Sequence, residues 1–194
     1  PKPSSAASDV YKRQVLFLTS VGAVAISPAL YKDLPYDPVR DFAPVSKVVN
    51  NATVFVVNPS NPAIDAADFV AKSQAAKQSV AIGSSGIGSI PHLTMEMFAD
   101  ASKANVLHVP YKGSAPLMND LMGGHVQYCF EGMTTATPLI QSGKVIALAQ
   151  TLQQRSKSQP NVPTVAEQGY PGFEASIWFG MVGPAKMPAA MVQR

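Results

Sequence analysis

Residues 80–92, VAIGSSGIGSIPH, hold the pattern that decides the fold class of this chain. The apolar run 80–82 predicts a buried strand, and the glycines and serines after it predict a tight turn. Pro91 suits the first turn of a helix, with Ser89 just upstream of it. A strand that passes through a short polar turn into a helix is the opening half of a βαβ unit.

The same alternation extends in both directions from this stretch. Runs rich in β-branched and aromatic residues predict further strands at 54–57, 106–109, 126–130, 145–148 and 176–179. Helical periodicity and capping residues predict helices at 63–77, 91–103, 115–122 and 135–141. Strands that alternate strictly with helices are typical of a mainly parallel sheet, so the predicted fold class is α/β.

Two clusters of turn-forming residues predict a division into two lobes. One is Asn58–Pro62, and the other runs from Arg155 to Gly172 and is rich in Ser, Gln, Pro and Gly. Each cluster alone fits a surface loop, but together they bracket a segment with its own strands. We therefore expect one lobe at 59–172 and another at 15–58 together with 173–194.

The start of the chain fits either a signal peptide or a strand. Two basic residues, an apolar run at 15–25 and the small-residue site Ala23–Ala25 satisfy the formal pattern of a secretory signal. Residues 28–31 continue as ordinary globular sequence, which favours a buried strand at 15–18 that turns through Thr19 and Ser20. Residues 1–14 are polar and have no periodicity, and we expect them to be a leader foreign to the fold.

The composition limits the classes of function. The chain has 194 residues, 46% hydrophobic and 14% charged, against a usual charged share of about 25%. These values exclude a disordered tail, a coiled coil and a highly charged nucleic-acid binder. The formal net charge is +3, and residues 1–14 contribute three basic residues and one acidic residue to it. We therefore expect no nucleic-acid partner.

Recognisable catalytic and metal-binding motifs are absent from the sequence. The three histidines, His92, His108 and His125, form no zinc-binding pattern. His92 and Glu96 stand four apart on a predicted helix, which fits a contact on the helix surface better than a metal site. The single cysteine, Cys129, lies in a predicted strand and is expected to be buried and inert. We expect no metal, no cofactor and no catalysis.

The turn at 83–89 has the chemistry of an anion site. A helix N-terminus leaves unpaired amides and about half a positive charge, and glycines let a ligand approach the backbone closely. Serine hydroxyls bind carboxylate oxygens without a fixed countercharge. A dinucleotide site would need glycine at Pro91, and a P-loop would need a lysine in the turn. The same residues also fit a tight turn without a ligand, and the sequence leaves both interpretations open.

Two more polar turns follow predicted strands. Tyr111–Ser114 comes after the strand at 106–109, and Glu131–Thr135 comes after the strand at 126–130. Turns that follow parallel strands open on the same edge of a sheet, so these turns and 83–89 are predicted to line one cleft. Lys112 fits either the counterion of a bound anion or a solvated surface lysine.

Seven motifs in order then connect the chain with a known family. They are Pro28–Tyr31, Leu34–Pro38, Asp41–Val45, Gly83–Leu93, His108–Gly113, Asn161–Glu167 and Trp178–Gly180. From about residue 15 to residue 194 the chain resembles the Bug-type substrate-binding proteins of tripartite tricarboxylate transporters. The resemblance implies a periplasmic-binding-protein fold, in which crossing strands join two α/β lobes. It also implies that residues 15–194 are a fragment that lacks both termini, with an incomplete first lobe at 15–58 and 173–194.

The resemblance further implies a function and a location. Such a protein is a periplasmic receptor that binds a small organic anion, such as a di- or tricarboxylate, an amino acid or an aromatic acid. It delivers the anion to membrane permease subunits and catalyses no reaction. The signal-like pattern at the start is then accidental, and a fragment of this kind is expected to bind its ligand at best in the millimolar range.

The residues expected to contact the ligand are Thr19 and Ser20 from the first lobe and Ser84, Ser85, Gly86, Gly88, Ser89, Tyr111 and Glu131 from the second. Glu131 stands where the family pattern has Asp, which leaves its contact open. One rival hypothesis is an α/β enzyme that acts on a carboxylate, with His92 or His108 as the base. The other is a ligand-sensing domain of a regulator with the same fold.

Overall fold

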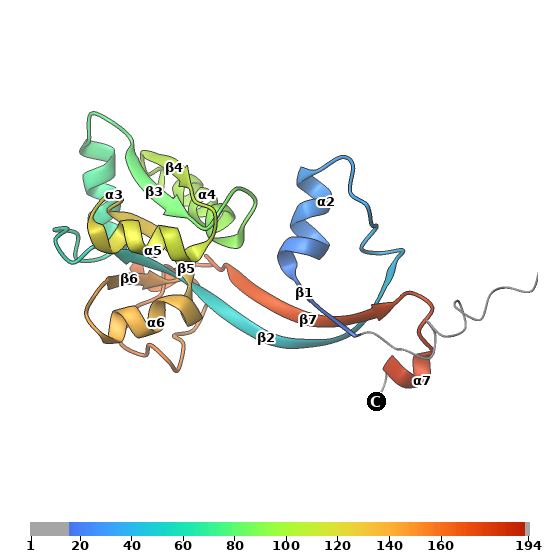
Figure 1. The fold of residues 1–194 in the computed structure, drawn as a ribbon. Coiled ribbons are helices and arrows are strands. Elements are labelled where there is room, and N and C mark those ends of the chain that lie inside the picture. Colours follow the sequence, from blue (N-terminus) through green and yellow to red (C-terminus); the bar gives the residue numbers. More distant parts are fainter. Residues whose placement is uncertain (1–15, 193–194) are drawn as a thin grey trace, which may run out of the picture. The chain divides into compact units, whose positions relative to one another are not determined.

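A computed structural model describes residues 16–192, so the predictions made for residues 1–15 lie outside the described part of the chain. The chain divides into two compact units. The central unit is Asn51–Ile177, and the split unit combines the chain up to Asn50 with the chain from Trp178 onward. The segment 59–172, which the sequence predicts as one lobe, lies inside the central unit. Two long strands, β2 (Phe42–Val57) and β7 (Ser176–Pro184), each run from one unit into the other (Figure 1).

The sheet of the central unit contains β3 (Val80–Ser84), β4 (Val106–Pro110), β5 (Tyr128–Gly132), β6 (Ile146–Gln150) and the second half of β2. Its strand order is β4-β3-β5-β2-β6. Strand β3 pairs in parallel with β4 and β5, as the alternating pattern predicts.

Strand β2 corrects the expectation of a mainly parallel sheet, because it runs antiparallel to β5 and to β6. The sheet is therefore mixed. Val57, at the end of β2, and Ile82, in β3, both pair with Tyr128. Strand β2 thus ends at the edge of the sheet where β3 begins, and the connection between them is not the crossover that makes strands parallel.

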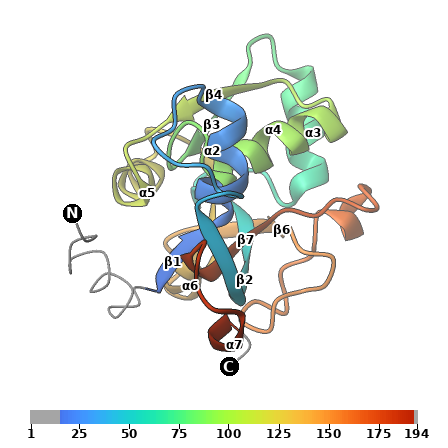
Figure 2. The ribbon, with the colours of Figure 1, turned by 90° about the vertical axis from the view of Figure 1, so that its right-hand side faces the viewer.

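Helices cover both faces of this sheet. On one face lie α3 (Ala66–Ala75) and α4 (Ile90–Ser102), and on the other lie α5 (Ser114–Gly123) and α6 (Met133–Gln141), as Figure 2 shows for α3, α4 and α5. Successive side chains of β2 point alternately into the two layers: Phe55 into the first and Val56 into the second. A strand buried on both faces must be apolar throughout, which explains the continuous apolar run 54–57.

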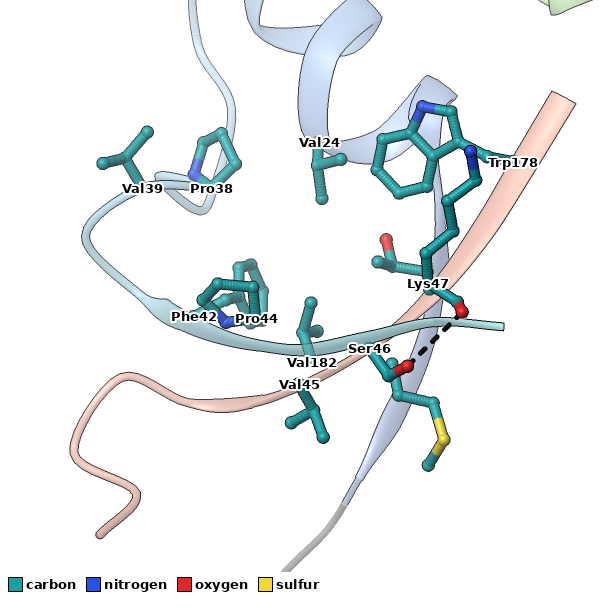
Figure 3. A pocket seen from close by; sticks show the side chains of 13 residues that line it. Val24, Pro38, Val39, Phe42, Pro44, Val45, Ser46, Lys47, Trp178 and Val182 are labelled. Carbon is teal, nitrogen blue, oxygen red and sulfur yellow. Dashed lines mark hydrogen bonds between the residues drawn. The ribbon is translucent and has the colours of Figure 1, made fainter. Parts of the chain in front are cut away.

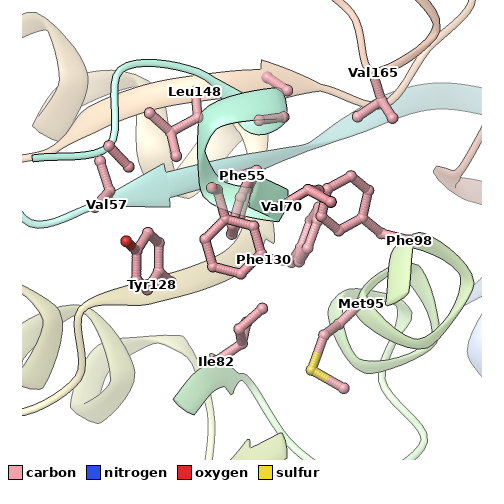
Figure 4. Close-up of a cluster of buried hydrophobic side chains, with 14 of the residues drawn as sticks. Phe55, Val57, Val70, Ile82, Met95, Phe98, Tyr128, Phe130, Leu148 and Val165 are labelled. Carbon is pink, nitrogen blue, oxygen red and sulfur yellow. The ribbon is translucent and has the colours of Figure 1, made fainter. Parts of the chain in front are cut away.

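The first layer is built around aromatic rings. Phe55 stacks on Phe130 with a centroid distance of 4.6 Å (Figure 4). It meets Phe69 edge-on with a centroid distance of 4.9 Å. Phe98 of α4 packs against Phe55 at 5.6 Å. This contact fixes α4, and therefore the turn that precedes it, on the sheet.

The start of α4 follows the chemistry predicted for it. Ser89 is the N-cap, and its hydroxyl accepts a hydrogen bond from the His92 amide at 3.3 Å. Pro91 lies in the first turn, where its missing amide costs no helical hydrogen bond. The helix ends at Ser102, and its C-cap Lys103 has a left-handed φ of 55°.

The split unit contains β1 (Phe17–Ser20), the π-helical turn η1 (Gly22–Ile26), α2 (Ser27–Leu30), α7 (Ala189–Val192) and the outer parts of β2 and β7. A short 3-10 helix, η2 (Ala166–Gln168), belongs to the central unit. Strand β1 pairs antiparallel with β7 from Phe17 opposite Val182 to Ser20 opposite Phe179.

The predicted first strand is therefore present but displaced. Thr19 and Ser20, expected in a turn, are the last two residues of β1, in keeping with the strand preference of β-branched threonine. The prediction that this strand is buried is wrong, because within the described chain β1 pairs only with β7 at the end of the sheet. Phe17 and Leu18 of β1 are 53% and 60% exposed, and Leu16 just before it is 47% exposed.

Candidate functional site

Three turns open at the carboxyl ends of the parallel strands β3, β4 and β5, where α/β sheets bind ligands. Backbone hydrogen bonds tie the first two turns together. The Tyr111 amide donates to the Ser84 carbonyl at 3.0 Å, and the Gly113 amide donates to the Ser85 carbonyl at 3.1 Å. The β3–α4 turn and the β4–α5 turn therefore form one connected structure.

The β3–α4 turn, residues 84–89, is braced by its own polar groups. The Gly86 amide donates to Ser84 Oγ at 3.2 Å, and Ser89 Oγ donates to the Gly86 carbonyl at 2.7 Å. Gly86 and Gly88 have φ angles of 143° and 75°, which residues with a Cβ rarely adopt. The glycines are therefore needed for the path of the turn itself.

The predicted contact residues of this turn differ in their access to a ligand. Ser84 is completely buried, whereas Ser85, Gly86, Gly88 and Ser89 are half-buried. Within the described chain, Ser85 is the serine of this turn whose hydroxyl has no hydrogen-bond partner. Ser85 therefore has a hydroxyl that is free to bind a ligand, whereas the Ser84 hydroxyl forms hydrogen bonds within the turn.

Two histidines from different elements lie directly behind the turn. The rings of His92 (α4) and His108 (β4) stack with centroids 3.9 Å apart and planes 15° apart. Nε2 of His108 is 2.6 Å from Ser84 Oγ, and the Gly88 amide donates to Nδ1 of His92 at 3.1 Å. Burial, and secondarily the neighbouring His92, lowers the pKa of His108.

Sequence reasoning missed this histidine stack. It did predict the contact between His92 and Glu96, whose Nε2 and Oε1 atoms are 3.5 Å apart. That contact lies within one helix and follows from a spacing of four residues. The stack needs the pairing of β3 with β4, which sets His108 beside Ile82 and which the local pattern does not contain.

Tyr111 and Glu131 both lie at this edge of the sheet with their polar groups turned inward. The Tyr111 hydroxyl donates to Asp120 Oδ2 at 2.9 Å, and burial together with that carboxylate raises the pKa of Tyr111 to about 12. Glu131 is only 4% exposed, and its Oε1 accepts from the Gly132 amide at 2.7 Å. Glu131 Oε2 is buried with no hydrogen-bond partner in the described chain, and burial raises the pKa of the carboxyl.

Thr19 and Ser20 belong to the split unit, whereas the other seven predicted contact residues belong to the central unit. Thr19 is buried and lines a pocket of about 640 Å³ within the split unit (Figure 3). The lining is mainly apolar and includes Phe42, Pro44 and Trp178, with Lys47 as its single charged side chain. Such a lining suits apolar groups better than carboxylates.

Residues 16–192 hold no group of three or more His, Cys, Asp or Glu side chains that could bind a metal ion. In the same part of the chain, every helix is too short or too polar to span a bilayer. Lys112, in the β4–α5 turn, is exposed.

Comparison with known families gives a match for residues 4–194. The matching family is described as the tripartite tricarboxylate transporter family receptor. The chain belongs to this receptor family. The match begins at residue 4, inside the segment 1–14 that is predicted to be foreign to the fold.

Relatives of the receptor family are similar over most of this chain. Protein BugT of Bordetella pertussis is 37% identical over 182 residues, which are 93% of this chain and 55% of BugT. The receptor chain thus spans about half the length of the curated relatives it matches.

Solved structures of periplasmic proteins have the same fold. A structure of R. palustris Rpa4515 with adipate is 31% identical, with a TM-score of 0.84, and the match covers 97% of this chain and 64% of that one. The periplasmic binding protein BugD is 34% identical, with a TM-score of 0.80 over 91% of this chain and 59% of that one. The predicted periplasmic-binding-protein-like α/β fold is therefore confirmed.

Proposed function

We propose that this chain is part of a periplasmic receptor that binds a small organic carboxylate and delivers it to the permease subunits of a tripartite transporter. The observation that carries the proposal is the half-buried β3–α4 turn, in which a free serine hydroxyl and backbone amides gather at the N-terminus of a 13-residue helix. These donors suit a carboxylate because they supply hydrogen bonds and a partial positive charge. Membership of the receptor family and the adipate bound by Rpa4515 support the same ligand class.

Within this proposal the predicted residues have different roles. Ser85 is the hydroxyl donor, and the amides of the β3–α4 turn complete the site. Ser84, Tyr111 and Glu131 support the turns from inside, since their polar groups are buried or engaged with the protein. Lys112 is exposed in the adjoining turn and contributes long-range attraction to the anion. Thr19 and Ser20 are the contacts proposed from the split unit.

The rival hypothesis of an enzyme rests on one geometric feature. Ser84 Oγ and His108 Nε2 are 2.6 Å apart, as in a nucleophile and its base. A nucleophile must reach its substrate, and Ser84 is completely buried. His92 is already engaged by the Gly88 amide. A receptor without catalysis therefore accounts better for both histidines.

An NMR titration tests the proposal even when binding is weak. Adipate, malate and citrate are added to the chain at millimolar concentration, and backbone amide shifts are followed; adipamide, which has the shape of adipate without its charge, is the control ligand. Adipate or one of the other acids is expected to shift the amides of residues 85–89, and adipamide is not. Equal responses to adipate and adipamide, or none to any of the acids, would contradict the proposal.

A substitution then tests whether the Ser85 hydroxyl binds the carboxylate. Ser85→Ala is expected to weaken carboxylate binding by about 1 to 3 kcal/mol, the range for a hydrogen bond to a charged group. The matched control is Ser79→Ala, which removes an exposed serine just before the opposite end of β3. Unchanged affinity in Ser85→Ala would remove this hydroxyl from the site and leave the amides as its donors.

A further inference from the structure

The amide that is best placed to meet an anion is occupied in this structure. The Gly88 amide lies one residue before the N-cap of α4, and it donates its hydrogen to Nδ1 of His92. An acceptor nitrogen thus stands where a carboxylate oxygen would bind. The histidine can hold this position only while Nδ1 carries no proton, because a protonated ring nitrogen is a donor.

The second histidine, His108, is connected through Ser84 to the Gly86 amide of the turn. His108 Nε2 contacts Ser84 Oγ at 2.6 Å, and Ser84 Oγ in turn accepts from the Gly86 amide. The stack of the two rings therefore connects the Gly86 amide, through Ser84, with the Gly88 amide. Both amides belong to the proposed carboxylate site.

We propose that the stacked pair His92–His108 positions the donors of the β3–α4 turn, with His92 Nδ1 holding the Gly88 amide until an anion takes its place. The proposal rests on the proposed function, because it assigns roles within the same site. His92 is a positioning residue when neutral. When it is protonated, it releases the Gly88 amide and places a positive charge beside it.

The charges around the pair decide which ring takes a proton. His92 faces His108 from β4 and Glu96 from its own helix, and the polar group behind His108 is Ser84 from β3. Two imidazolium rings with centroids 3.9 Å apart repel each other, so the pair accepts one proton before it can accept a second. Burial disfavours a charge on His108, whereas Glu96 lies 3.5 Å from Nε2 of His92, where a carboxylate stabilises a positive charge.

The charges around the pair determine whether the affinity for a carboxylate rises or falls with pH. Histidines change charge within about pH 5 to 8, and the first carboxyl group of a small organic acid is ionised through most of that range. A proton on Nδ1 of His92 adds a positive charge beside the turn and frees the Gly88 amide. Carboxylate affinity is therefore expected to rise as the pH falls, by about three- to tenfold for the gain of one hydrogen bond.

The first experiment needs no ligand. The amide shift of Gly88 and the ring shifts of His92 are followed by NMR across this pH range in the whole chain. The Gly88 amide is expected to change at the same midpoint as the His92 ring. A Gly88 amide that does not respond to the titration of His92 would overturn the proposal, whatever the chain binds.

The second experiment measures adipate affinity at both ends of the pH range. Three chains are compared: the unchanged chain, His92→Gln, which keeps an acceptor but cannot take a proton, and His125→Gln, which removes an exposed histidine outside the pair. His92→Gln is expected to bind adipate with little dependence on pH, and His125→Gln is expected to behave as the unchanged chain. Equal pH dependence in all three chains would contradict the role of His92. Failure of all three to bind adipate, malate or citrate would contradict the proposed function, and the Gly88 titration would still decide the role of His92.

Discussion

Glu131 places a carboxyl group where water does not reach it. Burial raises the pKa of this carboxyl, so the folded chain holds the proton more tightly than the unfolded chain does. The ionised form therefore destabilises the fold. This penalty is absent below the ordinary pKa of 4.5, grows as the pH rises through the raised value, and is complete above it.

Glu131→Gln is expected to stabilise the chain at neutral pH, because it removes a buried charge and keeps the shape of the side chain. The gain should be about 1 to 3 kcal/mol, the usual cost of a buried polar group without a partner, and should disappear in acid. Urea denaturation at neutral and acid pH measures it, with Glu174→Gln as the exposed control. A loss of stability at neutral pH would contradict this expectation, because the side-chain amide oxygen of the variant can still accept from the Gly132 amide and only the charge has been removed.

Individual residues of the site also differ in how far the sequence alone predicts them. The polar residues that form the β3–α4 turn are adjacent in the sequence, so the sequence alone predicted the turn, the cap at Ser89 and the helix that follows. The exposure of each serine to solvent depends instead on residues that are distant in the sequence. Ser84 and Ser85 are adjacent serines in the same turn, yet only Ser85 is open to a ligand, because β4 and its histidine cover Ser84.

At the scale of elements, the N-cap of α4 supports both the helix and the proposed site. Ser89 Oγ accepts from the His92 amide and donates to the Gly86 carbonyl, so one hydroxyl serves the helix and the turn. Ser89→Ala is expected to lower the free energy of unfolding by about 1 kcal/mol. Denaturant unfolding measures the change, and Ser89→Asp, another good N-cap, should restore most of it. Equal losses in both variants would mean that the Gly86 contact matters and the cap does not.

Strand β2 shows why some elements could be predicted only in part. Its second half is buried on both faces, and the apolar run 54–57 predicted it. Its first half, from Phe42 to Asn50, is mostly exposed and contains Pro44, so it has neither an apolar run nor a regular alternation. The direction of β2 in the sheet also depends on where the chain enters from the split unit, which no local pattern encodes.

At the scale of the whole molecule, the central unit is expected to fold on its own. Both hydrophobic layers, one around Phe55 and one around Val56, are made entirely of residues within Asn51–Ile177. A core of this kind supports a cooperative transition in a domain of about 100 residues or more. Residues 51–177 expressed alone should therefore be monomeric and melt in a single calorimetric transition. A gradual melt with strong binding of a hydrophobic dye would count against this unit.

The pairing of β1 with β7 has a consequence for the order of folding during synthesis. Strand β1 is made before the central unit, and most of its partner β7 is made after that unit. The central unit is continuous in sequence and is complete before most of β7 has been made. Domains usually fold from the N-terminus onward as they are translated, but β1 can pair only after the central unit and β7 have been made. During that interval the apolar side chains of β1 are available to chaperones and to other nascent chains, and translation speed sets how long they remain so.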